Sequence, residues 1–377
     1  MGTDVPAGTR DKSLGGTVGV GAVSTALTTD DVSGWNRAAL ATVRALAGTP
    51  YRTVVTVSAG RSIAASSRWC AGTVAVPPGG TPGYGEALRR RVAEGDYGAV
   101  LPASDVALDA LCPASARLVD KTMLAAVLAE VGLPVVPGRR FSGVAELRSA
   151  AEELDYPVVA KSVVKCGVDT LQATRLDGVP DLHSLPDAPG ELLVQPVVDG
   201  PMSALSGVVW QGTYLALCHQ RYERTWPPRA GVASAAVTVG PDATLEERLL
   251  PVLAGHDGVF QVQLIGPYVI DVNPRVYGSM SLAVAAGANL PLVACEAAAG
   301  RPGKLQRARP GVAYRWLEGD LRHLVTELRN GRYSGRDAVR RLLPSRGTAY
   351  SVESWRDPGP ALTRLSGALR ARVRSRT

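Results

Sequence analysis

The feature that most constrains the fold is the stretch of residues 191–273, which is mostly β in pattern. Its short apolar runs read ELLVQPVV, ALSGVVWQG, TYLALCHQRYER, GVASAAVTVG, GVFQVQLIG and PYVIDVN. Several of these runs alternate apolar and polar residues, as antiparallel strands with one solvated face do. The middle of the chain is therefore expected to form a mostly antiparallel sheet.

The segment before it, residues 17–115, mixes strand and helix patterns instead. The runs TVGVGAV, YRTVVTVSA, GTVAVPP and YGAVLPAS occur with the helical patterns WNRAALATVRALAG and GYGEALRRRVAEGD between them. Strands that alternate with helices predict a parallel sheet. Ser104 and Asp105, which follow the last of these runs, are interpreted first as a helix N-cap and second as a substrate contact.

Further helices are expected on both sides of the β-rich stretch. The pattern ARLVDKTMLAAVLAEVG predicts a helix of about fourteen residues that ends at Gly132 and Pro134. GVAELRSAAEELD predicts a second helix, and YPVVAKSVV predicts the strand after it. The chain beyond residue 316 reads as arginine-rich helices. The overall fold class is therefore α/β in the first part and α+β in the rest.

Composition argues against a nucleic-acid partner. The net charge is +7, but arginine is spread through the chain and only the tail after Arg364 is densely basic. Aromatic residues make up 5% and do not interleave with basic ones, so no stacking platform for bases is expected.

Cysteine usage and hydropathy indicate a cytoplasmic protein. The cysteines are odd in number, far apart and free of any CxxC pair, which argues against a disulfide framework or a zinc site. The N-terminus lacks the apolar core of a signal peptide. The longest apolar stretch, SLAVAAGANLPLVACEAAAG, contains Asn289, Pro291 and Glu296, so it predicts two helices joined by a turn rather than a transmembrane segment.

The stretch YVIDVNPRVYGSM, which begins at Tyr268, carries the most specific signal of a site. Positions two apart in a strand point to one face, so Asp271 and Asn273 present oxygen atoms side by side. Gln263 lies on the preceding run, and a hairpin near Gly266 would bring it to the same face. Oxygen ligands without histidine or thiol suit a hard ion such as Mg²⁺. The alternative is a strand that simply runs into an Asx-type turn.

A second set of polar residues lies upstream. Lys161 ends the β-branched run YPVVAKS, where a buried lysine needs a partner such as a phosphate oxygen. The alternative is an exposed lysine in a hairpin. Gln195, in ELLVQPVVDG, belongs either to a hinge whose backbone reads an adenine edge or to an ordinary edge strand.

These motifs together resemble a known superfamily. DK at 120–121, YPVVAKS at 156–162, ELLVQPVVDG at 191–200, QVQLI at 261–265 and VIDVNPRVYGS at 269–279 occur in the order typical of the ATP-grasp superfamily. The chain looks most like the carboxylate–amine ligases with a preceding Rossmann-like (pre-ATP-grasp) domain. The likeness covers about residues 17–310.

The resemblance implies a domain organisation. A Rossmann-like parallel-sheet domain is followed by a two-lobed ATP-grasp fold and a C-terminal helical segment. The expected boundaries are a flexible leader at 1–16, the pre-ATP-grasp domain at 17–115, lobe A at 116–195, lobe B at 196–315 and the helical segment with its basic tail at 316–377. Ligases of this type often form homodimers through the first domain, so the resemblance is compatible with a homodimer, although the sequence does not give the oligomeric state.

The resemblance also implies a role for each motif residue. Lys121 and Lys161, with Lys165 as a third, would hold the ATP phosphates. Gln195, Val197 and Val198 would line the adenine, and Gln263, Asp271 and Asn273 would hold Mg²⁺, with Mn²⁺ as an alternative ion. Arg275 would lie against the transferred phosphoryl group or the substrate carboxylate. Arg221 and Arg229 are either substrate-carboxylate clamps or surface charges.

The chain departs from the superfamily pattern at several of these positions. Gln263 stands where the first metal ligand is usually an acid, and Asp271 is one methylene shorter than the usual Glu. Gln195 replaces a frequent Glu of the hinge, and Met202 replaces the usual ribose-binding acid. The site is therefore less negative than is typical, and a degenerate, regulatory nucleotide-binding protein is one alternative.

The expected activity is the joining of a small carboxylate to an amine, with amino acids among the candidate substrates. ATP would activate the carboxylate as an acyl phosphate, and the products would be an amide, ADP and phosphate. An ATP-grasp carboxylase or carbamoyl-forming enzyme is the alternative among enzymes.

Overall fold

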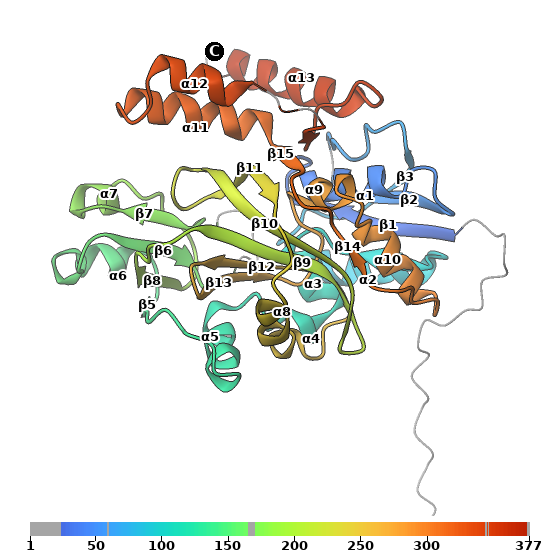
Figure 1. Ribbon diagram of the computed structural model, residues 1–377, viewed down its shortest axis with the longest axis horizontal. Coiled ribbons are helices and arrows are strands. Elements are labelled where there is room, and N and C mark those ends of the chain that lie inside the picture. Colours follow the sequence, from blue (N-terminus) through green and yellow to red (C-terminus); the bar gives the residue numbers. More distant parts are fainter. Residues whose placement is uncertain (1–23, 59, 165–169, 344, 346, 375–377) are drawn as a thin grey trace, which may run out of the picture.

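The computed structural model describes residues 24–58, 60–164, 170–343, 345 and 347–374. Within these residues the strands form three sheets, with the first sheet and the smaller antiparallel sheet on opposite sides of the largest one (Figure 1). The leader at 1–16 and the run TVGVGAV at 17–23 lie outside the described residues.

The first sheet is parallel, as predicted, with the strand order β3-β2-β1-β4. Its strands are β1 (Ser24–Asp30), β2 (Tyr51–Val57), β3 (Cys70–Ala75) and β4 (Ala99–Leu101). The helices of this domain are α1 (Arg37–Ala45), α2 (Tyr84–Glu94), α3 (Asp105–Leu111) and α4 (Pro113–Ala116).

Strand β1 lies later in the chain than the apolar run expected to form the first strand. Its sequence, STALTTD, is rich in threonine, and its last five residues are buried. The threonine hydroxyls are satisfied within the domain: Thr28 Oγ1 donates to the Leu101 carbonyl at 2.9 Å, and Thr29 Oγ1 accepts from the Ala103 N–H at 2.9 Å. A β-branched side chain with an internal hydrogen bond fits a buried central strand.

A small antiparallel sheet follows, with the order β5-β8-β6-β7. It contains β5 (Arg139–Phe141), β6 (Val158–Ser162), β7 (Thr174–Leu176) and β8 (Leu192–Pro196). Helix α6 (Val144–Ser149), a 3₁₀ turn at Ala151–Glu153 and helix α7 (Val179–His183) pack in its core. The predicted helix and strand of this region are confirmed, although the helix breaks into two pieces at Ala150.

The β-rich stretch forms the largest sheet and confirms the antiparallel prediction. Its order is β13-β12-β9-β10-β11-β15-β16, with β14 paired to β10. The strands are β9 (Met202–Trp210), β10 (Thr213–Trp226), β11 (Val232–Thr238), β12 (Gly258–Ile265), β13 (Tyr268–Asn273), β14 (Gln306–Arg307), β15 (Ala313–Arg315) and β16 (Ala349–Tyr350). Only the short additions β14 and β16 pair in parallel in this part of the chain.

Helix α5 (Lys121–Glu130) is shorter than the fourteen or so residues expected. Asp120 caps its N-terminus by accepting from the N–H groups of Thr122 and Met123, and Gly132 lies in the left-handed region just beyond its end. Its apolar residues Leu124 and Leu128 pack with strands of the largest sheet. Helix α5 thus docks on that sheet, although the sequence assigned it to the preceding lobe.

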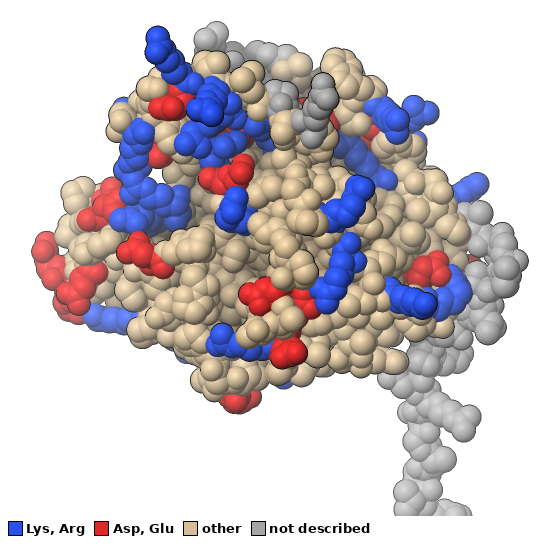
Figure 2. Space-filling model, in the orientation of Figure 1, with Lys and Arg blue, Asp and Glu red and all other residues tan. Residues whose placement is uncertain are grey.

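The remaining helices follow strand β11 in the sequence. They are α8 (Ala243–Leu249), α9 (Met280–Ala285), α10 (Leu290–Ala298), α11 (Leu317–Arg329), α12 (Gly335–Leu342) and α13 (Gly359–Arg374), with a 3₁₀ turn at Pro251–Leu253. Helices α9 and α10 confirm the predicted helix pair, and no helix in the described residues is long and apolar enough to span a membrane. Helices α11–α13 form a separate layer (Figure 1), and basic side chains gather over α11 and α12 (Figure 2).

One core unites the first domain with the largest sheet. Leu40 and Val43 of α1 share this core with Met280, Leu290 and other residues of α9 and α10. The carboxyl end of the first sheet is therefore held next to the end of β13, where the predicted site residues lie.

Candidate active site

Strands β12 and β13 form the predicted hairpin, and their register places four polar side chains next to one another. Gln263 lies opposite Asp271, and Gln261 lies opposite Asn273. Asn273 Nδ2 donates to Asp271 Oδ2 at 3.3 Å, and Gln263 Nε2 donates to Gln261 Oε1 at 3.2 Å. The three predicted ion ligands therefore lie side by side on the hairpin. Gln261, two residues before Gln263, was missed by the sequence interpretation although the period of a strand points to it.

Two buried lysines converge on the same strand. Lys121 is 5% exposed, and its Nζ lies 2.5 Å from Asp271 Oδ1 and 2.9 Å from the Val119 carbonyl oxygen. Lys161 is 7% exposed, and its Nζ donates to the Ile270 carbonyl at 3.1 Å. The structure thus brings together both lysines and Asp271, although Lys121 and Asp271 are 150 residues apart in the sequence. Lys165 lies outside the described residues.

The lysines line a cavity of about 240 Å³ between the small and the largest sheet, called here the first cavity. Its walls include Gln195, Val197, Val198 and Met202, together with the apolar side chains Val136, Val159, Trp226, Ile265 and Ile270. Gln195 Nε2 donates to the Val136 carbonyl at 2.8 Å, and the Val197 N–H donates to the Pro157 carbonyl at 3.3 Å. Because the Val197 N–H is already used in this way, a ligand in this cavity would contact other backbone groups of the hinge.

A second cavity of about 290 Å³ lies between the first domain and the β12–β13 hairpin. Asn36, Arg37, Ser104 and Asp105 line it from the first domain, and Tyr222, Gln261, Asn273, Arg275 and Ser279 line it from the other side. The two cavities share Gln172, Val232, Gln263 and Asp271. The hairpin side chains thus stand at the border between two adjoining spaces.

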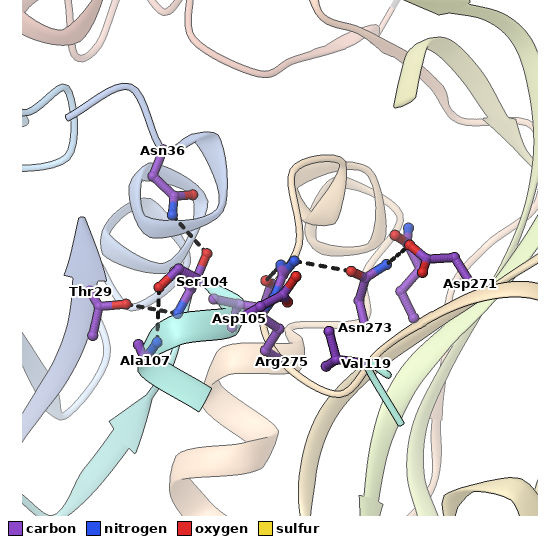
Figure 3. A network of polar contacts seen from close by, with 12 residues as sticks. Thr29, Asn36, Ser104, Asp105, Ala107, Val119, Asp271, Asn273 and Arg275 are labelled. Carbon is purple, nitrogen blue, oxygen red and sulfur yellow. Dashed lines mark hydrogen bonds and ion pairs between the residues drawn. The ribbon is translucent and has the colours of Figure 1, made fainter. Parts of the chain in front are cut away.

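Arg275 connects the hairpin to the first domain (Figure 3). Its Nε donates to Asp105 Oδ1 at 2.5 Å, and its Nη2 donates to Asn273 Oδ1 at 3.0 Å. Ser104 caps helix α3 by accepting from the Ala107 N–H at 3.2 Å, as predicted, and thereby places Asp105 at the first turn. Arg275 lines the second cavity, so the structure places it where a substrate could reach it.

The structure separates the two arginines that were predicted as substrate clamps. Arg229 is exposed, lines the first cavity with the lysines, and does not line the cavity that holds Arg275. Arg221 is exposed and lines neither cavity. Successive side chains of a strand point to opposite faces, and because Tyr222 points into the second cavity, Arg221 points away from it. A substrate clamp at Arg221 is not supported.

Two buried carboxyl groups lie behind the wall of the second cavity. Ser62 Oγ donates to Asp30 Oδ2 at 2.5 Å, and the Asn36 N–H donates to Asp30 Oδ1 at 3.2 Å. Tyr84 and Ser104 donate to the Asp31 carboxylate through their hydroxyl groups. Burial raises the pKa of Asp30 to about 6, with the neighbouring Asp31 as a smaller cause, and burial also raises the pKa of Asp31. The sequence analysis did not single out this pair.

The donor set at the hairpin fits a magnesium ion that is also bound by phosphate. Gln263, Asp271 and Asn273 offer hard oxygen atoms, but Asp271 is the one acid among them. In the described part of the chain no group of three or more histidine, cysteine, aspartate and glutamate side chains could hold a metal ion. Mg²⁺ is commonly bound by one or two carboxylates plus substrate phosphates, so these residues fit the ion in the company of a nucleotide.

Comparisons with known proteins give a fold but no relative by sequence. No protein-family model matches the chain, and no curated protein matches it in sequence. Among solved structures, an ADP complex of an N5-carboxyaminoimidazole ribonucleotide synthetase is similar over 82% of this chain and 85% of its own, at 12% identity and a TM-score of 0.58.

Two further structures point the same way. N5-carboxyaminoimidazole synthetase from Staphylococcus aureus, complexed with ADP, is similar over 80% of this chain and 83% of its own, at 13% identity and a TM-score of 0.57. L-amino acid ligase from Bacillus licheniformis is similar over 74% and 75%, at 16% identity and a TM-score of 0.51. These are ligases of the ATP-grasp fold, and the likeness confirms the fold that the sequence motifs predicted. The chain therefore has the ATP-grasp fold, with a parallel-sheet domain before it.

Proposed function

We propose that the protein is an ATP-dependent ligase that joins a carboxylate to an amine through an acyl phosphate and releases ADP and phosphate. The observation that carries this proposal is the pair of buried lysines, Lys121 and Lys161, that meet Asp271 at the border of two adjoining cavities. One cavity has the size and apolar walls for a nucleotide base, and the other has the polar lining for a small acid and an amine.

In this proposal the first cavity binds ATP. The base lies among Val136, Val159 and Ile265, with the hinge at Gln195 to Val198 along its edge. The ammonium groups of Lys121 and Lys161 bind the phosphates, because a buried cation beside a cavity favours an anionic ligand. Arg229, which also lines this cavity, adds positive charge at its side, whereas Arg175 there is paired with Asp177 at 2.7 Å. Two of the similar structures are complexes with ADP, which supports a nucleotide here.

The second cavity holds the acid and the amine. A carboxylate oxygen attacks the γ-phosphorus of ATP, the bond to the β-phosphate oxygen breaks, and ADP leaves. The amine nitrogen then attacks the acyl carbon, loses a proton, and phosphate leaves with the former carboxylate oxygen. Mg²⁺, or Mn²⁺ in its place, would be held by Gln263, Asp271 and Asn273 and would offset the phosphate charge.

The chain's own residues supply positioning and charge in this reaction, without a protein nucleophile. Lys121 and Lys161 hold the phosphates at the border, and Arg275 presents its guanidinium to the carbonyl oxygen that becomes negative. The Asp105 carboxylate and the Asn273 side chain keep Arg275 in place through its Nε and Nη2. A carboxylase or carbamoyl-forming reaction would use the same chemistry with bicarbonate or carbamate as the acid.

One observation favours a second candidate, a nucleotide-binding regulatory protein. The hairpin has a single acid, and that acid is paired with Lys121. A site with so little negative charge could bind ATP and yet fail to hold the metal well enough for turnover.

The test is to incubate the protein with MgATP and pooled amino acids and to measure ADP, phosphate and product mass. The ligase proposal expects ADP and phosphate in equal amounts and a new mass equal to the sum of two substrates less water. Tight ATP binding without turnover across panels of acids and amines would favour the regulatory candidate. The proposal includes a cytoplasmic location, where ATP is supplied and where Cys70, Cys112, Cys218 and Cys295, the free cysteines of the described residues, stay reduced.

A further inference from the structure

Arg37, at the start of helix α1, is the basic residue of the second cavity whose charge has no acidic partner. The other cations at this cavity are paired: Arg275 with Asp105 at 2.5 Å, and, at the border, Lys121 with Asp271 at 2.5 Å. Within the described residues no carboxylate oxygen lies within 4.0 Å of the Arg37 guanidinium, although Arg37 is half-buried and lines the cavity. A half-buried cation without a counter-ion favours an anionic ligand.

The Arg37 guanidinium is held in place by residues from the far end of the chain. Its Nη1 donates to Tyr314 Oη at 2.8 Å, and Tyr314 Oη donates in turn to the Gly278 carbonyl at 3.2 Å. Its Cζ lies 3.9 Å from the centroid of the Trp316 ring, within the range of a cation–π contact. One of its five N–H donors is used in the described structure, so the remaining donors are available on an oriented group.

Gly278 leaves the space that this position of Arg37 requires. A Cβ at residue 278 would lie 3.0 Å from Arg37 Nη2 and 3.2 Å from its Cζ. That approach is closer than ordinary van der Waals contact, and Tyr314 and Trp316 restrain the guanidinium from moving aside. The absence of a side chain at 278 is thus part of what orients Arg37.

From these contacts we propose that Arg37 binds a spare carboxylate of the substrate, that is, a carboxylate that takes no part in the reaction. The second cavity would then select an amino acid or a dicarboxylic acid over a molecule with no spare carboxylate. This inference rests on the proposed ligase function and names the substrate class of its second cavity.

Two observations indicate that the carboxylate bound by Arg37 is not the carboxylate that reacts. The reacting carboxylate must reach the border with the first cavity, where Gln263 and Asp271 lie, whereas Arg37 lines only the second cavity of the two. The groups near Arg37 on the cavity wall, Ser33, Asn36 and Ser279, are neutral. One unpaired positive charge among neutral donors matches a singly charged carboxylate better than a doubly charged phosphate ester.

The experiment compares matched ligands on the full chain with MgADP present. L-alanine and L-glutamate are compared with their α-amides, and glutarate is compared with butyrate, by calorimetric titration. For at least one pair we expect the protein to prefer the member with the spare carboxylate. Arg37→Ala should lower the affinity for that member roughly 10- to 100-fold and leave the affinity for its partner unchanged. Arg248→Ala, an exposed helical arginine outside both cavities, is the matched control and should change neither.

Gly278→Ala provides a second, milder test in case Arg37→Ala does not fold. It should reduce the same preference a few-fold and leave MgADP binding unchanged. The inference is overturned if the unmodified protein shows no preference for a spare carboxylate in any pair, or if both variants keep that preference in full. These readouts are binding constants, so they decide the role of Arg37 even if the protein releases no ADP from ATP. A failure to release ADP would count against the ligase function instead.

Discussion

The two cavities share a border but are built in different ways. The first is formed by the small and the largest sheets, has many apolar residues, and contains lysines that lie in strongly patterned segments. The second is formed where the first domain meets the hairpin, is lined by polar and charged groups, and depends on contacts between residues far apart in the sequence, such as Arg275 with Asp105. The first cavity therefore suits the nucleotide, which ligases with different substrates have in common. The second cavity suits the acid and the amine, which differ from one ligase to another.

The difference in charge leads to the same conclusion. At the first cavity, two buried ammonium groups are near a single acid, Asp271, so an anion with several charges would be stabilised there. At the second cavity, Arg275 is already paired with Asp105 and Arg37 is the cation left over. The first cavity therefore fits a triphosphate, and the second fits a molecule with few charges placed at defined points.

The largest effect is expected from removal of Lys161. Lys161→Ala should lower the affinity for ATP about 100-fold, because a buried charge-assisted hydrogen bond to phosphate contributes about 2–3 kcal/mol. The fold should survive, and Arg248→Ala should leave the affinity unchanged. Calorimetric titration with ATP measures the effect. Unchanged ATP affinity in Lys161→Ala would mean that the phosphates do not bind at the first cavity.

The next largest effect is expected at Gln263, which lies at the border between the two cavities. Gln263→Glu would place a second carboxylate opposite Asp271, at the position where the superfamily usually has an acid. We expect the Mg²⁺ concentration that gives half-maximal ATP binding to fall about 10-fold, since Mg²⁺ affinity rises with the number of charged ligands. Without Mg²⁺, the same variant should bind ATP more weakly, because the new carboxylate repels the phosphates. An increase or no change in metal-free binding would contradict this arrangement.

A smaller, pH-dependent effect is expected from Asp30, behind the second cavity. Its folded-state pKa of about 6 lies above the ordinary 3.8, so the folded protein binds the proton more tightly than the unfolded chain does. The resulting stabilisation is complete below about pH 4 and is lost as the pH rises to about 6. Asp30→Asn should remove this dependence and stabilise the protein above pH 6 by up to about 3 kcal/mol. Thermal unfolding of both proteins at pH 4.5 and 7.5 measures the difference.

The nucleotide serves as the control for this prediction. Asp30 contacts Asn36, which lines the second cavity but not the first. The rise in melting temperature that ATP causes should therefore be the same in Asp30→Asn as in the unmodified protein. If the substitution left the pH dependence of unfolding as it was, the Asp30 carboxyl would not titrate in the way its burial indicates.

The first cavity was far easier to predict from the sequence than the second. Lys121, Lys161, Gln263 and Asp271 belong to short patterned segments, and the period of a strand is enough to put Gln263 and Asp271 on one face of their hairpin. Their convergence follows from the fold that those segments together resemble. The sequence also predicted the parallel sheet, the antiparallel sheet and the helix pair α9–α10, because each has strong hydrophobic periodicity.

Beyond Asn273 and Arg275, the lining of the second cavity could not be predicted, because its contacts depend on how domains meet. Arg37 stands in a helix that shows only an ordinary amphipathic pattern, and its neighbours Tyr314 and Trp316 follow more than 270 residues later. The buried acid Asp30 ends a threonine-rich strand, and Asp31 follows it directly, whereas the apolar pattern placed the first strand earlier in the chain. Local periodicity carries no information on such pairings, so the substrate side of the site becomes visible only in the assembled structure.

The smallest expected effect separates Arg221, in strand β10, from Arg229, in the loop between β10 and β11. Arg229→Ala should weaken ATP binding a few-fold, because Arg229 is exposed at the wall of the first cavity and water screens its charge. Arg221→Ala should change ATP binding and turnover less than two-fold, roughly the limit for a surface charge outside both cavities. The two substitutions are matched in chemistry and differ in the face of the molecule that they alter. If Arg221→Ala had the larger effect on turnover, the substrate would have to bind on the opposite face of the largest sheet, and the contrast between the two cavities would no longer describe the site.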